Sequence, residues 1–154
     1  MKFRMLGLAA AVIAVAAWTT PTHPVSSAAT TYKAQMNGAS ETPPNKTTGT
    51  GTATFVLNGN RLRYTITVLG LTGPATMAHI HLGAKGVAGP PVYSFDIKKV
   101  AAGTLAEGYI DLTKEVSKGV SGDSLKTLLA NGGAYVNVHT AAHPGGEIRG
   151  QIEK

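Results

Sequence analysis

Residues 50–69 read T-G-T-A-T-F-V-L-N-G-N-R-L-R-Y-T-I-T-V-L, and this stretch gives the clearest indication of the fold. In its second half every second residue from Leu62 to Val68 is apolar, which is typical of a strand with one buried face. The first half alternates threonine with alanine before it ends in apolar residues, and Asn58-Gly59-Asn60 supplies a glycine-containing turn. We therefore predict a β-hairpin formed by Thr50–Leu57 and Arg61–Leu69.

Further short strands are indicated on both sides of this hairpin. They carry apolar residues at alternate positions and are bounded by glycine, proline or asparagine. Two intervening stretches, Gly38–Asn45 and Gly83–Pro91, contain several prolines and glycines and are predicted to be loops. The predicted strands are Thr30–Asn37, Ala75–Leu82, Val92–Ile97, Gly103–Leu112, Ala134–Thr140 and Glu147–Glu153.

One segment has helical spacing instead. Leucines at positions 125, 128 and 129 recur at intervals of three and four, Asp123 or Ser121 can cap the start, and Asn131-Gly132-Gly133 ends the helix. Such a short helix is marginal alone and must pack on the sheet. Seven or eight short strands with one short helix predict an all-β fold, an antiparallel Greek-key β-sandwich or barrel. The absence of alternating helices excludes an α/β fold.

The chain begins like a secretory signal peptide. Lys2 and Arg4 precede an apolar run, Leu6–Trp18, which is shorter than the roughly 20 residues needed to span a bilayer. Small residues follow, and cleavage after Ala28 or Ala29 satisfies the usual cleavage pattern. We predict a signal peptide at residues 1–29 and a single exported domain at residues 30–154, secreted or periplasmic. The alternative is an uncleaved membrane anchor.

Composition limits the classes of partner. The chain has no cysteine, so neither disulfides nor thiolate ligands can hold the exported domain together. Its formal charge of +6 falls to +4 when Lys2 and Arg4 leave with the signal, and the other basic residues are scattered. We expect no nucleic acid partner, because no basic patch is interleaved with aromatic residues. No second long apolar run follows, so no membrane association is expected after signal cleavage.

Four of the five histidines lie in two short segments of the sequence. Alternate residues of a strand point to the same side, so His79 and His81 are expected to present two imidazoles on one face while Ala78 and Ile80 turn inward. On the strand Ala134–Thr140, His139 is expected to share a face with Tyr135 and Asn137. If the two strands are neighbours, three imidazoles converge.

These histidines suggest a metal site. His143 follows His139 by four residues in a predicted turn and could supply a fourth nitrogen, and Met77 shares a face with His79. Nitrogen-only sites suit copper(II) and zinc, and the Irving–Williams order favours copper. We predict metal ligation by His79, His81, His139 and His143, with copper preferred and zinc as the alternative. The missing cysteine excludes a blue-copper centre, and the lack of an acidic loop argues against calcium.

The opposing interpretation is that the histidines are structural, at the surface or at strand ends. Two carboxylates and one arginine are further candidates. Glu41, in the predicted loop Gly38–Asn45, is expected to be solvated more readily than to bind a ligand. Glu147 and Arg149 share a face of the last strand, and a simple cross-strand charge pair is favoured over a role in orienting a ligating imidazole.

Several segments resemble the CHRD domain, which is named for its repeats in the extracellular antagonist chordin and also occurs singly in secreted bacterial proteins. The resemblance covers nearly all of Thr31–Ile152. Most single-domain members have no assigned activity, and members often have asparagine at the position of His143. The matching segments are Gly38-Ala39-Ser40-Glu41-Thr42-Pro43-Pro44, Ala78-His79-Ile80-His81-Leu82-Gly83-Ala84 with Gly89-Pro90, and Tyr135-Val136-Asn137-Val138-His139-Thr140 through Pro144-Gly145-Gly146-Glu147-Ile148-Arg149-Gly150-Gln151.

A more remote resemblance is to the copper–zinc superoxide dismutases, Greek-key β-sandwiches whose copper is held partly by a His-x-His strand and by a histidine on a late strand. His79, His81 and His139 match that pattern. The dismutases' histidine-rich zinc loop, disulfide and catalytic arginine have no counterpart in this sequence. Dismutation is therefore a hypothesis that the resemblance alone does not establish.

Three functions follow as hypotheses. The favoured one is an exported, non-enzymatic metal-binding domain that prefers copper(II) and serves copper binding, storage or protection. The second is a superoxide-dismutase-like copper enzyme at the same histidines. The third is an extracellular interaction module with structural histidines, whose partner is an extracellular protein that the sequence does not identify.

Overall fold

A computed structural model describes residues 28–154. The predicted signal peptide lies almost entirely outside the described residues and stays a prediction. The described chain forms strands β1 (Thr30–Asn37), β2 (Thr50–Asn58), β3 (Arg61–Leu69), β4 (Ala75–Leu82), β5 (Pro91–Ser94), β6 (Gly103–Asp111), β7 (Glu115–Ser117), β8 (Val120–Ser121), β9 (Ala134–Thr140) and β10 (Ile148–Gln151), with helix α1 (Gly122–Ala130) and the short 3-10 helix η1 (Gly38–Ser40).

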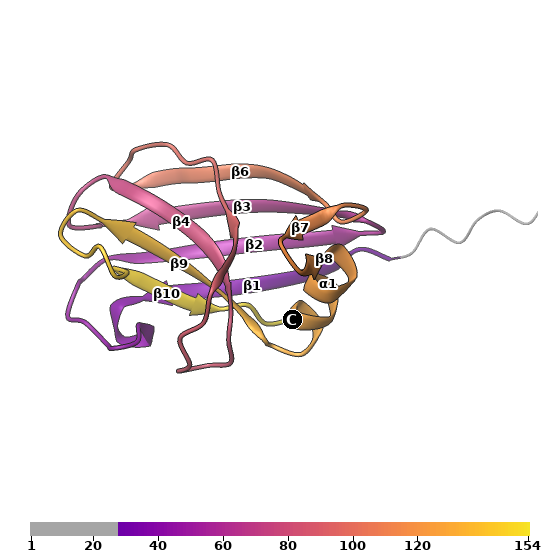
Figure 1. Ribbon diagram of the computed structural model, residues 1–154. Coiled ribbons are helices and arrows are strands. Elements are labelled where there is room, and N and C mark those ends of the chain that lie inside the picture. Colours follow the sequence, from indigo (N-terminus) through magenta and orange to yellow (C-terminus); the bar gives the residue numbers. More distant parts are fainter. Residues whose placement is uncertain (1–27) are drawn as a thin grey trace, which may run out of the picture.

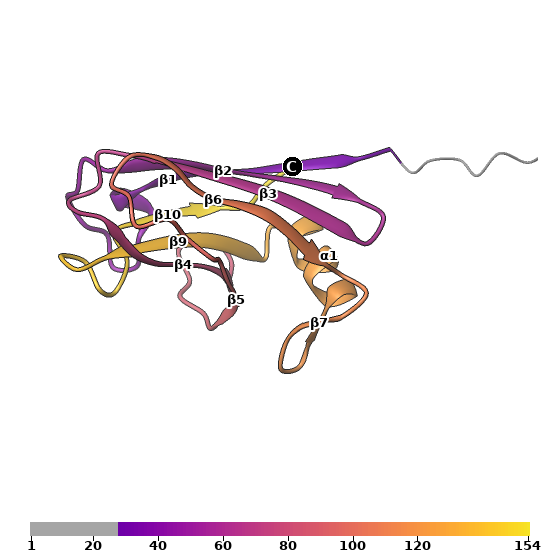
Figure 2. The ribbon, with the colours of Figure 1, turned by 90° about the horizontal axis from the view of Figure 1, so that it is seen from above.

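Eight of these strands form one antiparallel sheet in the order β5-β4-β9-β10-β1-β2-β3-β6. The sheet curls on itself, so that β4 and β9 lie across from β2 and β3 (Figures 1 and 2). The predicted all-β antiparallel fold with one short helix is confirmed. The expected sandwich or barrel takes the form of a single curled sheet, a half-barrel whose edges are β5 and β6.

The apolar core fills the inside of the curl. It contains the apolar residues that the alternating pattern assigned to inner faces, among them Phe55, Leu62, Ile80 and Val136, none of which is exposed to solvent. Helix α1 lies at one end of the curl, where it buries Leu125 and Leu129 (Figure 2). Burial of a side chain of this size stabilises the fold by about 1.5–3 kcal/mol. Because the chain has no cysteine and therefore no disulfide, its stability depends on this core.

The strand predictions are confirmed with small changes of boundary. The hairpin β2–β3 pairs from Thr50↔Leu69 to Asn58↔Arg61. β5 is shorter than predicted, and β10 begins at Ile148 instead of one residue earlier. The small hairpin of β7 and β8 was not predicted, because its two and three residues are too short to show a period.

Strand β4 contains a register shift that decides which way its histidines point. Ala75 pairs with Thr140 and Met77 pairs with His139, so one residue of β4 has no partner on β9. Consequently Ala75 and Ala78 both face the core, although they are three positions apart. From Ala78 onward the strand alternates regularly, and both of its histidines lie on the outer face of the sheet.

Of the two residues that the sequence offered as helix caps, the structure selects Ser121. Its Oγ accepts a hydrogen bond of 3.1 Å from the backbone N–H of Ser124. Replacing Ser121 by alanine is expected to lower the free energy of unfolding by about 1 kcal/mol, because this N–H loses its partner. Urea denaturation measures the change. Asp123→Asn, at the other candidate position, is the control and should cost less; the reverse order would contradict the assignment.

Candidate metal centre

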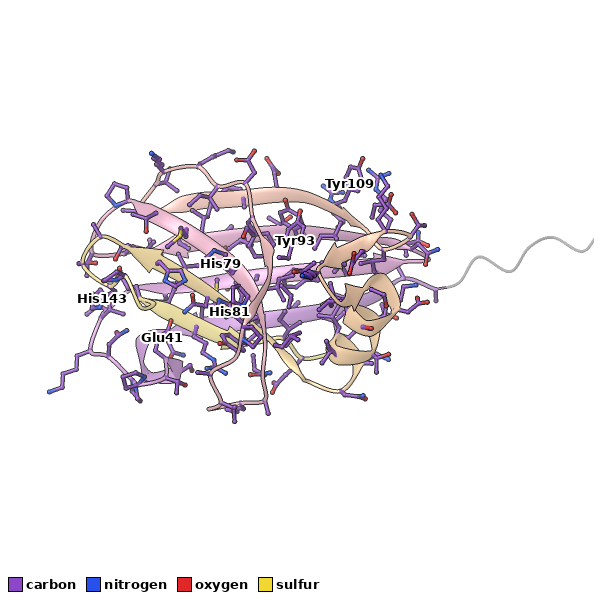
Figure 3. All side chains as sticks on the ribbon, in the orientation of Figure 1. Glu41, His79, His81, Tyr93, Tyr109 and His143 are labelled. Atoms are coloured by element: carbon purple, nitrogen blue, oxygen red, sulfur yellow. The ribbon has the colours of Figure 1, made fainter. Side chains whose placement is uncertain are left out.

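Three histidines converge on the outer face of the sheet where β4 and β9 lie side by side. Figure 3 labels the two from β4, His79 and His81. One ring nitrogen from each of His79, His81 and His139 lies within 4.8 Å of those of the other two. The predicted convergence of three imidazoles is confirmed, and this cluster could hold a metal ion. No second group of three or more such side chains occurs within residues 28–154.

The pairing of the strands produces this geometry. His79 lies directly opposite Asn137, and His139 lies opposite Met77, so His79 and His139 are diagonal neighbours. Nδ1 of His79 is 3.3 Å from Nε2 of His139, and the two ring centroids are 5.1 Å apart. The ring of His81 lies 5.5 Å from that of His79, so the β4 pair can reach the same point.

Backbone carbonyls fix the tautomer of two of the imidazoles. Nδ1–H of His81 donates to the carbonyl oxygen of Gly89 at 2.8 Å, and Nδ1–H of His139 donates to that of Pro144 at 2.9 Å. A carbonyl oxygen can only accept, so the proton is on Nδ1 and the lone pair is on Nε2. Metal-binding histidines are commonly oriented by this kind of second hydrogen bond.

The lone pair on Nε2 of His81 accepts no hydrogen bond within the described residues. This nitrogen is buried and has no hydrogen-bond partner among residues 28–154. A buried acceptor without a partner destabilises the folded state by about 1–3 kcal/mol, and a metal ion at the centre of the cluster would satisfy it. Three neutral nitrogens from His79, His81 and His139 fit a borderline ion such as copper(II) or zinc.

The surroundings keep the three imidazoles uncharged. Burial lowers the pKa of each below the ordinary histidine value of 6.5. For His79 and His81, the positive charge that His139 would carry lowers the pKa further, and for His81 the Arg149 guanidinium does so as well. A neutral imidazole is the metal-binding form, so the cluster is ready to bind at neutral pH.

His143, the fourth predicted ligand, is not part of this group. It is half-buried in the turn between β9 and β10, where its backbone carbonyl accepts from Gly146 and its backbone N–H donates to the carbonyl of Thr140. The structure therefore brings three of the four predicted ligands together. Ligation by His143 stays a prediction.

Tyr135 extends the site on one side. Its ring stacks on that of His81, with 4.9 Å between centroids and 16° between planes. The guanidinium of Arg149 lies 3.4 Å from the centre of the same ring. The hydroxyl of Tyr135 accepts a hydrogen bond from the backbone N–H of Gly89, whose carbonyl in turn holds His81. The tyrosine was expected on this face, but its contact with Arg149 was not predicted.

Within residues 28–154, neither Glu147 nor Arg149 forms the predicted cross-strand charge pair, and that prediction is wrong. Arg149 is 2% exposed and donates instead to the hydroxyl of Thr42 and to the carbonyls of Ala84 and Val87. Because Ala84 and Val87 belong to the β4–β5 loop that also carries Gly89, Arg149 holds in place the loop that orients His81. The residue thus acts on the site through backbone contacts.

Glu147 lies just before β10 and is fully buried, but its hydrogen-bond partners are not those of Arg149. Its carboxylate accepts hydrogen bonds from the hydroxyls of Thr47, Thr72 and Thr140 and from the backbone N–H of Thr72. Burial alone would raise the pKa of Glu147, but these hydrogen bonds together lower it. The carboxylate therefore stays charged and ties two loops to the end of β9.

Glu41 was expected to be solvated, and that prediction is also wrong. Its side chain is 7% exposed, and Oε1 accepts a hydrogen bond of 2.8 Å from Nδ2 of Asn137. Burial raises the pKa of Glu41 to about 7. Gly146 makes room for it, because a Cβ at that position would lie 2.6 Å from Oε1. The close approach of the loop that carries Glu41 and the β9–β10 loop explains why position 146 is a glycine. The sequence gives no sign that Gly146 and Glu41 are neighbours.

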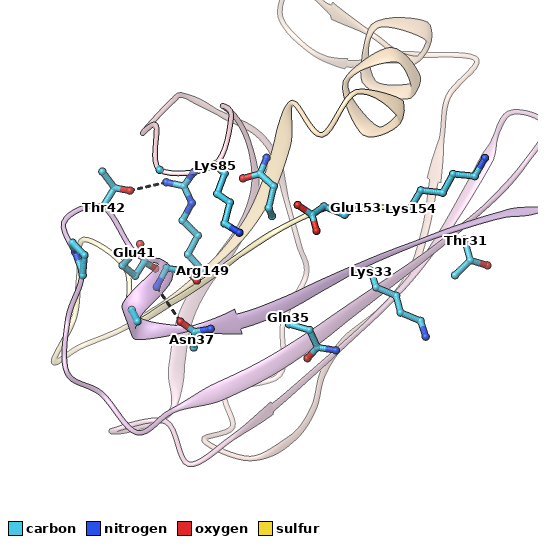
Figure 4. A pocket seen from close by; sticks show the side chains of 15 residues that line it. Thr31, Lys33, Gln35, Asn37, Glu41, Thr42, Lys85, Arg149, Glu153 and Lys154 are labelled. Carbon is cyan, nitrogen blue, oxygen red and sulfur yellow. Dashed lines mark hydrogen bonds between the residues drawn. The ribbon is translucent and has the colours of Figure 1, made fainter.

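A groove of about 1030 Å³ adjoins the cluster beyond Glu41 and Arg149 (Figure 4). It runs along the outer faces of β1 and β10, and the β4–β5 loop borders it. Its charged lining comprises Lys33, Glu41, Lys85, Arg149, Glu153 and Lys154. The groove shares Glu41 and Arg149 with the surroundings of the histidines, so the two features are contiguous.

Together, the fold and the cluster define an antiparallel β domain that could hold one metal ion at three histidines. The sequence matches the CHRD domain over residues 32–152, and the chain belongs to this family. Neither the curated proteins nor the solved structures contain a match to the chain. The comparisons therefore do not show the expected likeness to superoxide dismutases. Within residues 28–154, none of the helices has the length and apolarity needed to cross a membrane.

The raised pKa of Glu41 predicts a pH-dependent effect of Glu41→Gln. The pKa is 4.5 without the fold and about 7 within it, so the contribution of this carboxyl to stability is complete below pH 4.5 and is lost as the pH rises through 7. Glutamine never ionises, so the variant should gain stability relative to the wild type between pH 4.5 and pH 8, by up to about 3 kcal/mol.

Urea denaturation at several pH values measures this difference. Glu153→Gln, an exposed carboxyl on the same groove, is the matched control for replacing a carboxyl by an amide. A Glu41→Gln effect that does not change with pH would contradict the assignment.

Proposed function

We propose that this CHRD domain is an exported copper(II)-binding protein that serves copper storage or protection. One observation carries the proposal: backbone carbonyls hold Nδ1–H of His81 and His139, which leaves Nε2 as the lone-pair nitrogen of each imidazole, and Nε2 of His139 lies 3.3 Å from Nδ1 of His79. The predicted signal peptide supports export. When bound, copper would supply Lewis-acid and redox chemistry at this point, and the chain's own residues orient the ligands and keep them neutral.

Copper is preferred over zinc because three imidazole nitrogens favour copper(II) in the Irving–Williams order. The cluster lies in the outer layer of the protein, where His79 and His81 are half-buried. An ion can therefore reach them from solvent without opening the core. The three-nitrogen set leaves room for a further ligand, as copper(II) in a tetragonal geometry requires.

A second candidate function is suggested by the groove, whose lysines line the outer faces of β1 and β10. In this case the domain binds an extracellular protein and the histidines are structural. A partner captured through the groove should stay bound to a His79→Ala/His81→Ala variant and in the presence of a chelator. Loss of the partner under either condition would favour the metal instead.

Added copper(II) is expected to stabilise the purified mature domain. At a hundredfold excess over the dissociation constant, the free energy of unfolding should rise by about 3 kcal/mol, measured as an increase in Tm. The electron paramagnetic resonance spectrum should show nitrogen hyperfine structure. Both signals should disappear in His79→Ala/His81→Ala, because the chelating pair is removed.

His143→Ala is the comparison variant, since this histidine is a predicted ligand that lies outside the three-nitrogen group. Copper(II) binding equal to that of the wild type would exclude His143 as a fourth ligand, and weaker binding would support that prediction. Wild-type protein that shows neither an increase in Tm nor nitrogen hyperfine structure would overturn the proposed function.

The lowered pKa values predict that copper binding persists in mild acid. Protons compete with the metal only when the pH approaches the pKa of the free ligands, and all three lie below 6.5. Copper(II) affinity should therefore begin to decrease at a lower pH than it would for imidazoles with the ordinary pKa. A short peptide with the sequence His-Ile-His, whose imidazoles are solvated, should begin to lose copper at a higher pH. Coincident curves would contradict the pKa assignment.

A further inference from the structure

We propose that Met77 is a fourth ligand of the cluster and that its thioether gives the site a high affinity for copper(I). The inference rests on the proposed copper function and extends it: the domain takes up copper in either oxidation state. No change of oxidation state is needed for binding.

The register of β4 and β9 places Met77 at the site. Met77 lies directly opposite His139 and two residues before His79, so its side chain is on the same outer face as both imidazoles. Residues directly opposite in an antiparallel pair have Cβ atoms about 4.5–5.5 Å apart. The methionine therefore occupies the position next to His139 that a fourth ligand from β4 would need.

The register shift within β4 is what creates this position. Without it, continuous alternation from the buried Ala75 would turn Met77 into the core, on the same side as Ala75. The shift turns Met77 and the two β4 histidines to the same face. β-bulges are over-represented beside functional sites, where they redirect side chains in this way.

Met77 is not part of the apolar core. Its side chain is 47% exposed, whereas Met36, which serves the core, is 2% exposed. Three rotatable bonds and freedom from close packing allow the thioether to turn toward the cluster. An exposed, flexible thioether beside three imidazoles is a donor set with a clear chemical preference.

That preference is for copper(I). Thioethers are soft ligands that select copper(I), whereas imidazole also suits copper(II) and zinc. Removing the sulfur should therefore weaken copper(I) binding and leave the binding of the other two ions intact. Met77→Leu keeps the size and apolar character of the side chain at an exposed position, so the fold should be unaffected.

Competition with a chromophoric copper(I) chelator tests the proposal. Met77→Leu should bind copper(I) roughly tenfold more weakly than the wild type, the loss expected for about 1.4 kcal/mol of ligand binding. Its copper(II) and zinc affinities should match those of the wild type. X-ray absorption of the copper(I) form should show sulfur scattering in the wild type and only nitrogen or oxygen scattering in Met77→Leu.

The possible results separate the two proposals. Equal copper(I) affinities, or copper(I) scattering without sulfur in the wild type, would overturn the role of Met77 while the copper(II) spectrum upholds the proposed function. Failure of the wild type to bind either oxidation state would overturn both. Leu69→Ala, at another exposed apolar residue on β3, is the control and should leave copper(I) affinity unchanged.

Discussion

The pairing of β4 with β9 is the constraint on which the cluster depends. Side chains alternate along a strand, so a slip of one residue would move both β4 histidines from the outer face into the core. The apolar residues prevent this slip: Ile80 and Val136 are partners in the register, and both are fully buried. Hydrophobic packing on the inner face therefore fixes the register of the two strands. The same register determines the position of His79 against His139 on the outer face.

Register alone does not orient an imidazole, and the loops complete the site. Gly89 and Pro144 come from the β4–β5 and β9–β10 loops, and each carbonyl holds one Nδ1–H. The first loop is held in turn by Arg149, which donates to two of its carbonyls. A buried guanidinium that lacks a carboxylate partner within residues 28–154 is costly unless its donors are satisfied, and here loop carbonyls satisfy them.

Much of the fold could be predicted because a period of two is visible in a short sequence window. The hairpin and the two histidine-bearing strands were predicted with little error, and with them the meeting of three imidazoles. The interactions that no period encodes were missed. Burial of Glu41 depends on Asn137, which is 96 residues away in sequence, and the contacts of Arg149 depend on loop carbonyls, which every residue has. The register shift before Met77 could not be predicted either, because it interrupts the alternating pattern of β4 instead of following it.

The buried polar atoms connect the site to the stability of the fold. Both faces of β9 are covered, the inner one by the apolar core and the outer one by a polar layer. Among residues 28–154, three buried side-chain atoms lack a hydrogen-bond partner, and two of them, Nε2 of His81 and Oδ1 of Asn137, belong to residues on the histidine face. A cation held by the three histidines would satisfy Nε2 of His81. A metal ion bound there would offset part of the cost of burying this layer, so metal binding and folding would be thermodynamically coupled.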